Sequence, residues 1–494
     1  MTITLRITEA TYGRLRPHHL DPSVPHERIS FLFGRAVYEG DELRSVLVAE
    51  PPILPADDCY LSQSGGHLAL DPTVMNSILA RFARSDADVF INVHDHWFCQ
   101  SGTHFSSIDS RDERAMGQYL RERFEPMLVR RPDIGKPRQI ISLALVLDQT
   151  GLAARYVDAA GEFHPIHRVE IVGPIAHRII PNGLRRPVQA LPERLLRHRD
   201  IVTPEQQAYI ADTTFAIVGC GGLGSIAAEE LYRIGARSFV LFDPDELEPH
   251  NLNRWQGGQP RDVGANKAQL LARKLSALSG GRAKATPIAL SALSPVALRH
   301  LARADVLIGC TDNHLARYFL NRFSVQYLMP WFDAGVNIRT GNTVELESRY
   351  FAVIPGYTAC AECTAYQLID REEVDRALTD DVTSRAREQA GYVQERPEII
   401  AAASAYPLNQ RAMSTLTMEL MNWVCGYRPF ATTVAEYWAA GRFQRSDRDN
   451  HPERPDPSCP VCGQLLGVGD NAELPRPRSA NRTAEIFEEA RRAS

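Results

Sequence analysis

Short apolar runs alternate with amphipathic segments over the second half of the chain. The apolar runs are four to six residues long, too short for helices, and the segments between them repeat their apolar positions at helical spacing. Buried strands that alternate with amphipathic helices predict a parallel, doubly wound α/β sheet. The predicted strands are 215–220, 238–243, 305–310 and 330–335, and the predicted helices are 224–235 and 315–328.

The same pattern divides the chain into four parts. Residues 1–172 contain short β-like runs in a mixed α+β pattern, and residues 173–192 are rich in proline and arginine without a sustained apolar period, which indicates a linker. Residues 193–466 carry the alternation of strands and helices. Residues 467–494 predict a polar C-terminal tail with one short helix over 484–492.

Composition excludes several classes of protein. The 494 residues are 44% hydrophobic and 23% charged, as in a globular chain, and the net charge of −5 gives no general attraction to nucleic acid or to an anionic membrane. The first residues lack the apolar core of a signal peptide, and no stretch has the length of a membrane span. We therefore expect a cytoplasmic protein whose partner is neither a nucleic acid nor a membrane.

A glycine-rich turn follows the first predicted strand of the second part. Its glycines, Gly219, Gly221, Gly222 and Gly224, stand between that strand and a predicted helix, where backbone amides and the helix N-terminus can hold a phosphate. Asp243 ends the next strand, in the position of a carboxylate that accepts hydrogen bonds from ribose hydroxyls. These features predict a nucleotide site, and a dinucleotide oxidoreductase fits them as well as an ATP enzyme does.

Further polar residues separate the two interpretations. Asn251 and Arg254 lie in the motif N-L-x-R, Lys267 follows downstream, and Asp312 stands in C-T-D-N at the end of another predicted strand. Two cations and a carboxylate at strand ends suit a triphosphate with Mg²⁺ better than the pyrophosphate of a dinucleotide. The motif therefore favours ATP.

With the D-x-D motif at 243–245, these residues make 193–466 resemble the ThiF-type activating enzymes, which include sulfur-carrier activators and ubiquitin-activating enzymes. The resemblance implies a Rossmann-like activating-enzyme domain in which Asp243 binds ribose, Arg254 and Lys267 hold the triphosphate, and Asp312 lies beside Mg²⁺ near the α-phosphate. The implied reaction is attack of a C-terminal glycine carboxylate on the α-phosphorus with loss of pyrophosphate.

The resemblance also implies a homodimer formed through this domain. Arg199, just ahead of the first strand, resembles the arginine that family members donate to the ATP bound by a second subunit. One position departs from the pattern, since Trp255 and then Gln256 follow Arg254 where family members often have glutamine directly.

Two C-x-x-C pairs, Cys360 with Cys363 and Cys459 with Cys462, provide four thiolates for one tetrahedral structural zinc. Such a site is closed to water and pins a long crossing segment to its domain. The segment 364–405 that follows the first pair contains no cysteine, although activating enzymes that form a thioester usually carry their nucleophile there. We therefore expect the reaction to stop at the acyl-adenylate. The other cysteines, expected to be small buried side chains, are Cys59, Cys99, Cys220, Cys310 and Cys425.

A second candidate metal site lies near the N-terminus. His94 and His96 have the spacing of side chains on one face of a strand, and Asp109 stands at the start of a predicted helix. Three such ligands with an open fourth position describe a hydrolytic zinc. Glu27, ahead of the apolar run 29–34, could take a proton from the metal-bound water.

This set resembles the JAMM (JAB) metallopeptidases, whose domain is α+β and cytidine-deaminase-like. The resemblance covers residues 1–172 and implies that Ser106 steadies the oxyanion while Glu27 acts as the general acid/base. Two features depart from it: Trp97 replaces a proline, and the interval from His96 to Ser106 is one residue longer than usual. His104, inside that interval, is interpreted as a polar loop residue.

Together the two parts predict an enzyme that adenylates the C-terminal glycine of a ubiquitin-like protein and trims or deconjugates the same protein. The expected cofactors are ATP, Mg²⁺ and two Zn²⁺, one structural and one catalytic. Three alternatives stay open: a sulfur-carrier activator for cofactor or natural-product synthesis, an N-terminal domain that only binds the modifier, and a dinucleotide oxidoreductase. The sequence leaves open the identity of the modifier, its final acceptor and the use of a conjugating enzyme.

Overall fold

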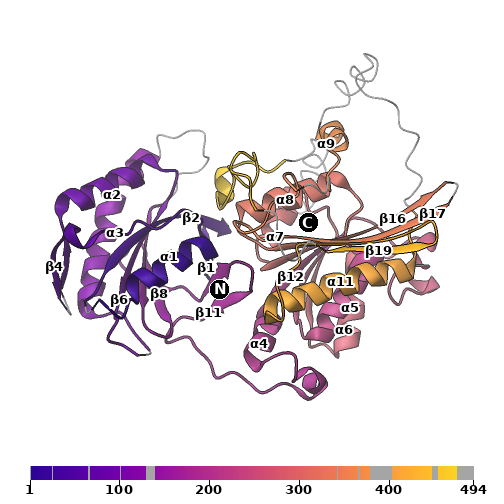
Figure 1. The fold of residues 1–494 in the computed structure, drawn as a ribbon, viewed down its shortest axis with the longest axis horizontal. Coiled ribbons are helices and arrows are strands. Elements are labelled where there is room, and N and C mark those ends of the chain that lie inside the picture. Colours follow the sequence, from indigo (N-terminus) through magenta and orange to yellow (C-terminus); the bar gives the residue numbers. More distant parts are fainter. Residues whose placement is uncertain are drawn as a thin grey trace, which may run out of the picture. The chain divides into compact units, whose positions relative to one another are not determined.

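The structure is a computed structural model that describes residues 2–24, 26–39, 41–64, 67–100, 102–128, 139–341, 343–364, 368–378, 403–447 and 454–475. Its contacts divide the chain into two compact units (Figure 1). The first unit comprises Met1–Pro187 with Gln326–Leu328 and Leu466–Glu473, and the second comprises Val188–Val325 with Met329–Leu465 and Leu474–Ser494. In the described part of the chain, no helix is both long enough and apolar enough to span a bilayer.

A nine-stranded mixed sheet forms the centre of the first unit, in the order β11-β10-β1-β3-β2-β6-β7-β8-β9. The described residues of this unit also form the α-helices α1, α2 and α3 and a separate β4-β5 hairpin. The elements are β1 Thr4–Thr8, α1 Glu9–His19, β2 Ile29–Glu39, β3 Glu42–Val48, β4 Tyr60–Ser64, β5 His67–Leu70, α2 Pro72–Arg84, β6 Val89–Asp95, α3 Ser107–Leu128, β7 Ile141–Leu147, β8 Leu152–Val157, β9 Phe163–Pro165, β10 Arg168–Val172 and β11 His177–Ile179.

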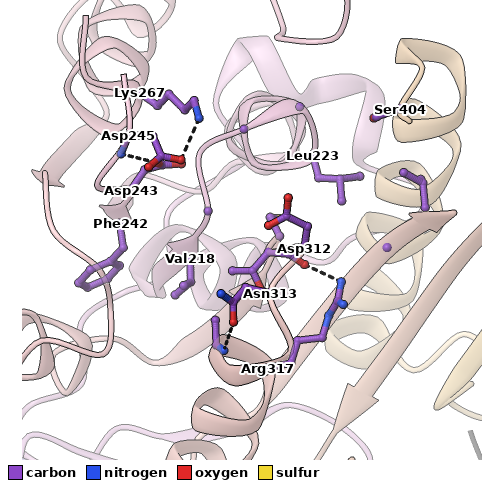
Figure 2. Close-up of a pocket in the computed structure, with 18 of the residues that line it drawn as sticks. Val218, Leu223, Phe242, Asp243, Asp245, Lys267, Asp312, Asn313, Arg317 and Ser404 are labelled. Atoms are coloured by element: carbon purple, nitrogen blue, oxygen red, sulfur yellow. Dashed lines mark hydrogen bonds and ion pairs between the residues drawn. The ribbon is translucent and has the colours of Figure 1, made fainter. Parts of the chain in front are cut away.

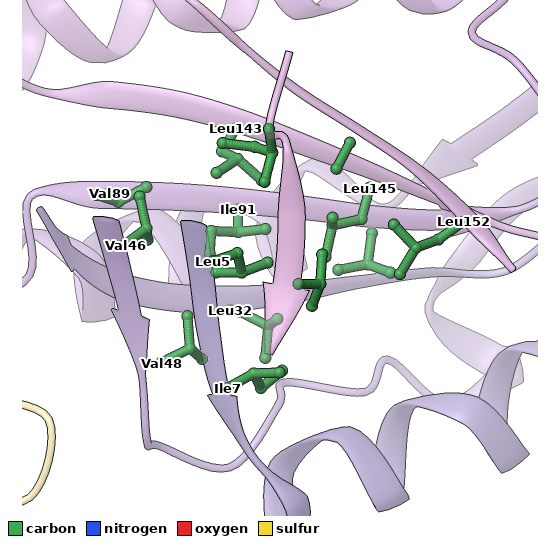
Figure 3. Close-up of a cluster of buried hydrophobic side chains, with 14 of the residues drawn as sticks. Leu5, Ile7, Leu32, Val46, Val48, Val89, Ile91, Leu143, Leu145 and Leu152 are labelled. Carbon is green, nitrogen blue, oxygen red and sulfur yellow. The ribbon is translucent and has the colours of Figure 1, made fainter. Parts of the chain in front are cut away.

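The alternation of side chains along each strand gives this sheet two apolar faces. In β6, Val89, Ile91 and Val93 join one cluster, shown with its labelled neighbours in Figure 3, while Phe90 points to the other face. The first cluster includes Leu15 of α1, and the second includes residues of α2 and α3. The sheet is therefore covered by helices on both faces, with the end of β6 anchored in the core.

The first unit extends beyond the limits that the sequence predicts. β11 falls within the expected linker 173–192, yet it pairs antiparallel with β10 and buries Ile179. Residues 466–473, at the start of the expected tail, also belong to this unit, where the Asn471 amide donates to the Asp86 carbonyl at 3.0 Å. Both segments are too short to show a period in sequence. The helix expected over 484–492 lies outside the described residues.

An eight-stranded sheet forms the centre of the second unit, in the order β14-β13-β12-β15-β16-β17-β18-β19. Its helices and strands are α4 Pro204–Asp212, β12 Thr214–Val218, α5 Gly222–Ile234, β13 Ser238–Phe242, α6 Lys267–Ser279, β14 Lys284–Ile288, α7 Pro295–Leu301, β15 Val306–Gly309, α8 His314–Gln326, β16 Trp331–Thr340, β17 Val344–Val353, α9 Arg371–Leu378, α11 Tyr406–Cys425, β18 Thr433–Ala439 and β19 Arg442–Asp447. Its short 3₁₀ helices are η3 Glu193–His198, η4 Pro249–Asn251 and η5 Pro260–Asp262, while η1 Asp57–Cys59 and η6 Gly469–Asn471 belong to the first unit.

The doubly wound prediction is confirmed for β12, β13, β15 and β16, which are parallel, and β14, which was not predicted, adds a further parallel strand at the edge. Helices α5, α6 and α11 lie on one face of the sheet, and α7 and α8 lie on the other (Figure 1). The antiparallel half from β16 to β19 was not predicted, and pairing with β17 extends β16 to Thr340. The chain order reverses between β12 and β15, and a sheet of this kind binds ligands at such a point, beyond the carboxyl ends of its strands.

Candidate functional site

The glycine-rich turn connects β12 to α5 and leaves the amides at the start of the helix free. Gly221 is the N-cap of α5 and provides no side chain to cap it. Gly219 has a φ of +91°, and a Cβ at this position would stand 2.7 Å from the carbonyl oxygen of Cys310. The turn therefore needs glycine at 219, and the amides at the start of α5, for which the described residues provide no side-chain cap, can hold a phosphate.

We expect Gly224→Ala to destabilise the second unit and Gly221→Ala to leave its stability almost unchanged. A Cβ at Gly224 would stand 1.9 Å from the carbonyl oxygen of Gly219, whereas a Cβ at Gly221 would meet no atom within 4 Å. Overpacking of this kind typically costs about 1–3 kcal/mol, and about 1 kcal/mol lowers Tm by roughly 2–4 °C in a unit of this size. Thermal unfolding of both variants measures the difference, and equal melting temperatures would contradict the expectation.

A cavity of about 630 Å³ opens beyond the carboxyl ends of β12, β13 and β15 (Figure 2). Gly224 lies buried beneath the glycine turn, and Arg199 is not part of the lining formed by the described residues. The residues predicted from sequence that do line the cavity are Gly219, Gly221, Gly222, Asp243, Asn251, Arg254, Lys267 and Asp312. The fold thus brings together side chains that are separated by almost a hundred residues in the chain.

Asp243 links the end of β13 to the glycine turn. Its carboxylate accepts hydrogen bonds from the backbone amides of Cys220 at 2.7 Å and Asp245 at 2.9 Å. Burial raises the pKa of this carboxyl, while the Asp245 amide and the charge of Lys267 act in the opposite direction. The ammonium of Lys267 lies 3.1 Å from the Asp245 carboxylate (Figure 2). One side of the cavity thus holds two carboxylates and a cation.

Trp255 follows Arg254 at the position where family members often have glutamine, and the structure gives each residue a distinct place. Arg254 lines the cavity and donates to the carbonyl oxygen of His250 at 2.8 Å. Trp255 is buried, and its indole N–H donates to the carbonyl oxygen of Cys220 at 2.7 Å. The tryptophan therefore supports the glycine turn from behind and is not part of the cavity lining.

The cavity also contains charged residues that sequence reasoning missed. Arg317 of α8 has its Nε 3.1 Å from the Asp333 carboxylate and donates from Nη2 to the carbonyl oxygen of Thr311 at 2.5 Å. Arg349 of β17 lines the same cavity. Helical spacing could have placed Arg317 beside Asn313, four residues earlier, but no motif marks Arg349.

The cysteines near the cavity have no features of a nucleophile. Cys220 and Cys310 are buried, and burial raises the pKa of both thiols, so they stay protonated at neutral pH. Cys59, Cys99 and Cys425, which were also expected to be buried, are half-buried. Most of the segment 364–405 lies outside the described residues, although Ala403 and Ser404 line the cavity.

The two C-x-x-C pairs come together as one cluster. The Sγ atoms of Cys360 and Cys363 are 3.8 Å apart, those of Cys360 and Cys459 are 3.7 Å apart, and those of Cys363 and Cys462 are 3.4 Å apart. Four sulfurs at the corners of a tetrahedron around zinc, with Zn–S bonds of about 2.3 Å, stand about 3.8 Å from one another. The geometry of the thiol groups therefore fits a structural zinc.

His94, His96 and Asp109 also form a cluster, with their ligand atoms all within 4.8 Å of one another. His94 lies near the end of β6, His96 follows that strand, and Asp109 lies in the first turn of α3. His94 Nε2 is buried and has no hydrogen-bond partner among the described residues, although Asp109 Oδ1 is 3.3 Å away. His96 Nδ1 lies 2.8 Å from the Thr103 hydroxyl, which leaves Nε2 as its ligand atom. This donor set fits a zinc ion with an open position.

Glu27 and Ser106 accompany this cluster. Glu27 is buried, and burial raises the pKa of its carboxyl to about 7, against the influence of His94. Ser106 caps the start of α3: its hydroxyl accepts from the Asp109 amide at 3.1 Å, and its own amide donates to Asp109 Oδ2 at 2.6 Å. His104 is exposed and lies outside the cluster, as its interpretation as a loop residue requires.

A chain of buried polar groups holds this part of the first unit together. His19 Nδ1 lies 2.8 Å from Asp95 Oδ2, and His19 Nε2 lies 2.7 Å from the Ser30 hydroxyl. Asp95 Oδ2 also accepts from the Arg28 amide at 3.0 Å. Asp95 stands between the two histidines of the cluster, so this carboxylate ties their strand to the segment that carries Glu27.

Sequence comparisons place the second part of the chain in a known family. Residues 193–461 match the ThiF family. "Ubiquitin-like modifier-activating enzyme 5" of Drosophila grimshawi is 33% identical over 177 residues, which cover 34% of this chain and 43% of the relative. The corresponding enzyme of Aedes aegypti is 29% identical over the same length, with the same coverage. The chain therefore spans less than half the length of these relatives.

Solved structures show weaker similarity. E. coli MccB, in a crystal structure with ATP, has a TM-score of 0.42 and 19% identity, covering 56% of this chain and 76% of that one. PaaA has a TM-score of 0.38 and 16% identity, covering 55% of this chain and 88% of that one. The family match, in contrast, extends over more than half of the present chain and includes every element around the cavity up to the second cysteine pair. The protein therefore belongs to the ThiF family.

Proposed function

We propose that residues 193–466 catalyse ATP-dependent adenylation of a C-terminal carboxylate, the glycine end of a ubiquitin-like protein or peptide. The observation that carries the proposal is one cavity that combines an amide-rich turn with Asp243, Arg254, Lys267 and Asp312. Membership of the ThiF family and the names of the curated relatives support the same activity.

In this reaction a carboxylate oxygen attacks the α-phosphorus of ATP. The bond from that phosphorus to the bridging oxygen breaks, and pyrophosphate leaves with the electron pair. Arg254 and Lys267 stabilise negative charge on the phosphates, and Asp312 supplies an oxygen ligand of the kind that Mg²⁺ prefers. The amides of the glycine turn hold a phosphate, and Asp243 binds the ribose.

Pyrophosphate exchange tests the proposal. The full-length protein should transfer labelled pyrophosphate into ATP only when a protein or peptide with a free C-terminal glycine is present. Exchange that needs no such partner would contradict the proposal, and so would absence of exchange with a partner that binds the protein in the presence of ATP. The same partner with its last glycine removed serves as the control.

The proposal includes two features carried over from the family. The product is the acyl-adenylate, because the segment 364–405 contains no cysteine. The enzyme acts as a homodimer in which Arg199 reaches the ATP of the second subunit. The Arg199 side chain is 73% exposed, and its nearest carboxylate, Asp200, is 3.7 Å away, so the guanidinium is accessible to another chain. The homodimer proposal would be contradicted if the protein were monomeric in solution and still exchanged pyrophosphate at its full rate.

We also propose that residues 1–172 hold a catalytic zinc that hydrolyses a peptide or isopeptide bond of the same partner. The cluster of His94, His96 and Asp109 beside the buried carboxyl of Glu27 carries this second activity. Zinc bound by these residues would activate a water molecule, and Glu27 is placed to accept the proton. The bond cleaved would be the one after the terminal glycine.

Replacing Glu27 by glutamine is expected to lower the rate of this cleavage by about 10²–10⁴-fold, the usual contribution of a general base. The variant should still bind two zinc ions per chain, because Glu27 is not a ligand of either cluster. Cleavage of a fusion to the modifier's C-terminus measures the rate, and metal analysis measures the zinc. Glu42→Gln, an exposed change on β3, is the control. The proposal would be refuted if wild-type protein bound only one zinc per chain, or if the Glu27→Gln variant cleaved the fusion at the wild-type rate.

A further inference from the structure

Two arginines come together on the wall of the nucleotide cavity. Arg349 of β17 is the cross-strand partner of Gly335 of β16, and Arg317 reaches the same place from α8. A Cβ at Gly335 would stand 2.8 Å from Arg349 Nε and 3.3 Å from Arg317 Nη2. Because Gly335 has no side chain, both guanidinium groups can lie over the same stretch of β16.

In the described part of the chain, only one of the two arginines is in contact with a carboxylate. The Arg317 side chain is hydrogen-bonded to Asp333 and to the Thr311 carbonyl, but the Arg349 side chain has no hydrogen bond or ion pair within the described ranges, although Asp333 and Glu347 attract it from farther away. Burial lowers the pKa of Arg349, and the like charge of Arg317 lowers it further. A guanidinium group does not lose its proton in a protein. This wall of the cavity therefore holds a guanidinium charge that no described carboxylate contacts, and a bound anion would stabilise it.

The position of the pair indicates which anion it binds. Figure 2 shows Lys267 and Arg317 on either side of Asp312. In phosphoryl transfer the attacking oxygen and the leaving oxygen stand roughly in line on opposite sides of the phosphorus. If Arg254 and Lys267 hold the phosphates that leave, the group that binds the attacking carboxylate belongs on the other side, where Arg317 and Arg349 stand.

We propose that Arg317 and Arg349 bind the terminal carboxylate of the chain to be adenylated, and that Arg349 makes the enzyme select a free carboxylate over an amide. The inference rests on the proposed adenylation. Arginine suits the task because its planar, forked donors match the two oxygens of a carboxylate. Arg349 is then a specificity residue that positions the nucleophile, while Arg317 is held in place by Asp333.

Fluorescence polarisation with two labelled decapeptides tests the inference. Both peptides end in glycylglycine, one with a free carboxylate and the other with a terminal amide, and the full-length protein is saturated with Mg²⁺ and a non-hydrolysable ATP analogue. We expect wild-type protein to bind the acid at least about tenfold more tightly than the amide, the usual effect of a hydrogen bond to a charged group. Arg349→Met should remove that preference and leave the affinity for the nucleotide analogue unchanged.

Matched variants separate this role from general damage to the sheet. Arg339→Met removes an exposed arginine from β16 of the same hairpin and should keep the preference. Arg349→Lys keeps the charge without the fork and should bind the acid with intermediate affinity. The inference is overturned if wild-type protein binds neither peptide or binds both equally, or if Arg349→Met still prefers the acid. It is also overturned if Arg349→Met loses affinity for the nucleotide analogue, since Arg349 would then bind a phosphate. A protein that prefers the acid to the amide but exchanges no pyrophosphate would refute the proposed adenylation and leave the carboxylate site standing.

Discussion

Replacing Lys267 by alanine should lower the rate of pyrophosphate exchange by at least about 100-fold, as does removal of one preorganised group that stabilises a transition state. The Lys267 side chain is only 12% exposed, and its ammonium lies 3.1 Å from the Asp245 carboxylate. Once it is removed, Asp243 and Asp245 stand beside the phosphates without their cation. We therefore expect the KM for ATP to rise as kcat falls.

The control for this change is Lys284→Ala, because Lys284 is an exposed lysine on β14 of the same sheet. It should exchange pyrophosphate at the wild-type rate. Initial rates over a range of ATP concentrations separate kcat from KM for both variants. A Lys267→Ala protein that melts like the wild type and exchanges within a fewfold of its rate would show that this cation does not serve the reaction.

Replacing Cys459 by alanine should have the largest effect on stability. A thiolate lost from a four-sulfur site weakens metal binding, and structural zinc contributes about 10–16 kcal/mol in isolated zinc fingers. Even a fraction of that exceeds the roughly 2–5 kcal/mol lost with an ordinary large buried side chain. We expect the variant to lose one zinc per chain and the second unit to melt more than about 10 °C below wild type.

Cys425→Ala is the matched control, because Cys425 is a half-buried cysteine of the same unit outside the cluster. It should retain the metal and the wild-type transition. Metal analysis after gel filtration and differential scanning calorimetry give the two readouts. An unchanged zinc content in Cys459→Ala would exclude the cluster as the metal site, and a lost zinc with an unchanged transition would exclude a structural role.

The centre of the second sheet could be predicted from sequence because its signals are local. The strands β12, β13 and β15 and the start of β16 are apolar runs, and Gly219 follows the first run directly, whereas the edge strand β14 is mostly exposed and was not predicted. The partners of that turn are not local. Trp255 and Cys310 reach it from other loops, and only the fold shows that one donates to the turn and the other forbids a side chain at 219.

The difference between local and non-local signals also explains why Arg349 was not predicted as a residue of the cavity. Asp243, Lys267 and Asp312 stand at strand ends or helix starts, where position alone indicates a ligand-binding role. Arg349 lies in the middle of an antiparallel strand, and its neighbour Gly335 belongs to another strand. The register of this hairpin decides that the two residues face each other, and a shift of one residue would separate them, so neither strand alone indicates the contact.

The first unit was harder to delimit for a related reason. Its candidate ligands form a recognisable set, but β11 has three residues and the segment 466–473 has no regular period. Their place in the unit comes from hydrogen bonds and burial against strands formed much earlier in the chain, as with Asn471 and Asp86.

The interleaving of the two units has a practical consequence for dissecting this protein. The first unit draws on three separate stretches of the gene, two of which are encoded within or after the second unit. A fragment that ends at Pro187 would therefore lack residues 326–328 and 466–473 of the first unit. A fragment that begins at Val188 would contain these two segments without the sheet against which they pack. Each activity is therefore best assigned with point variants of the whole chain that inactivate either the nucleotide site or the histidine cluster.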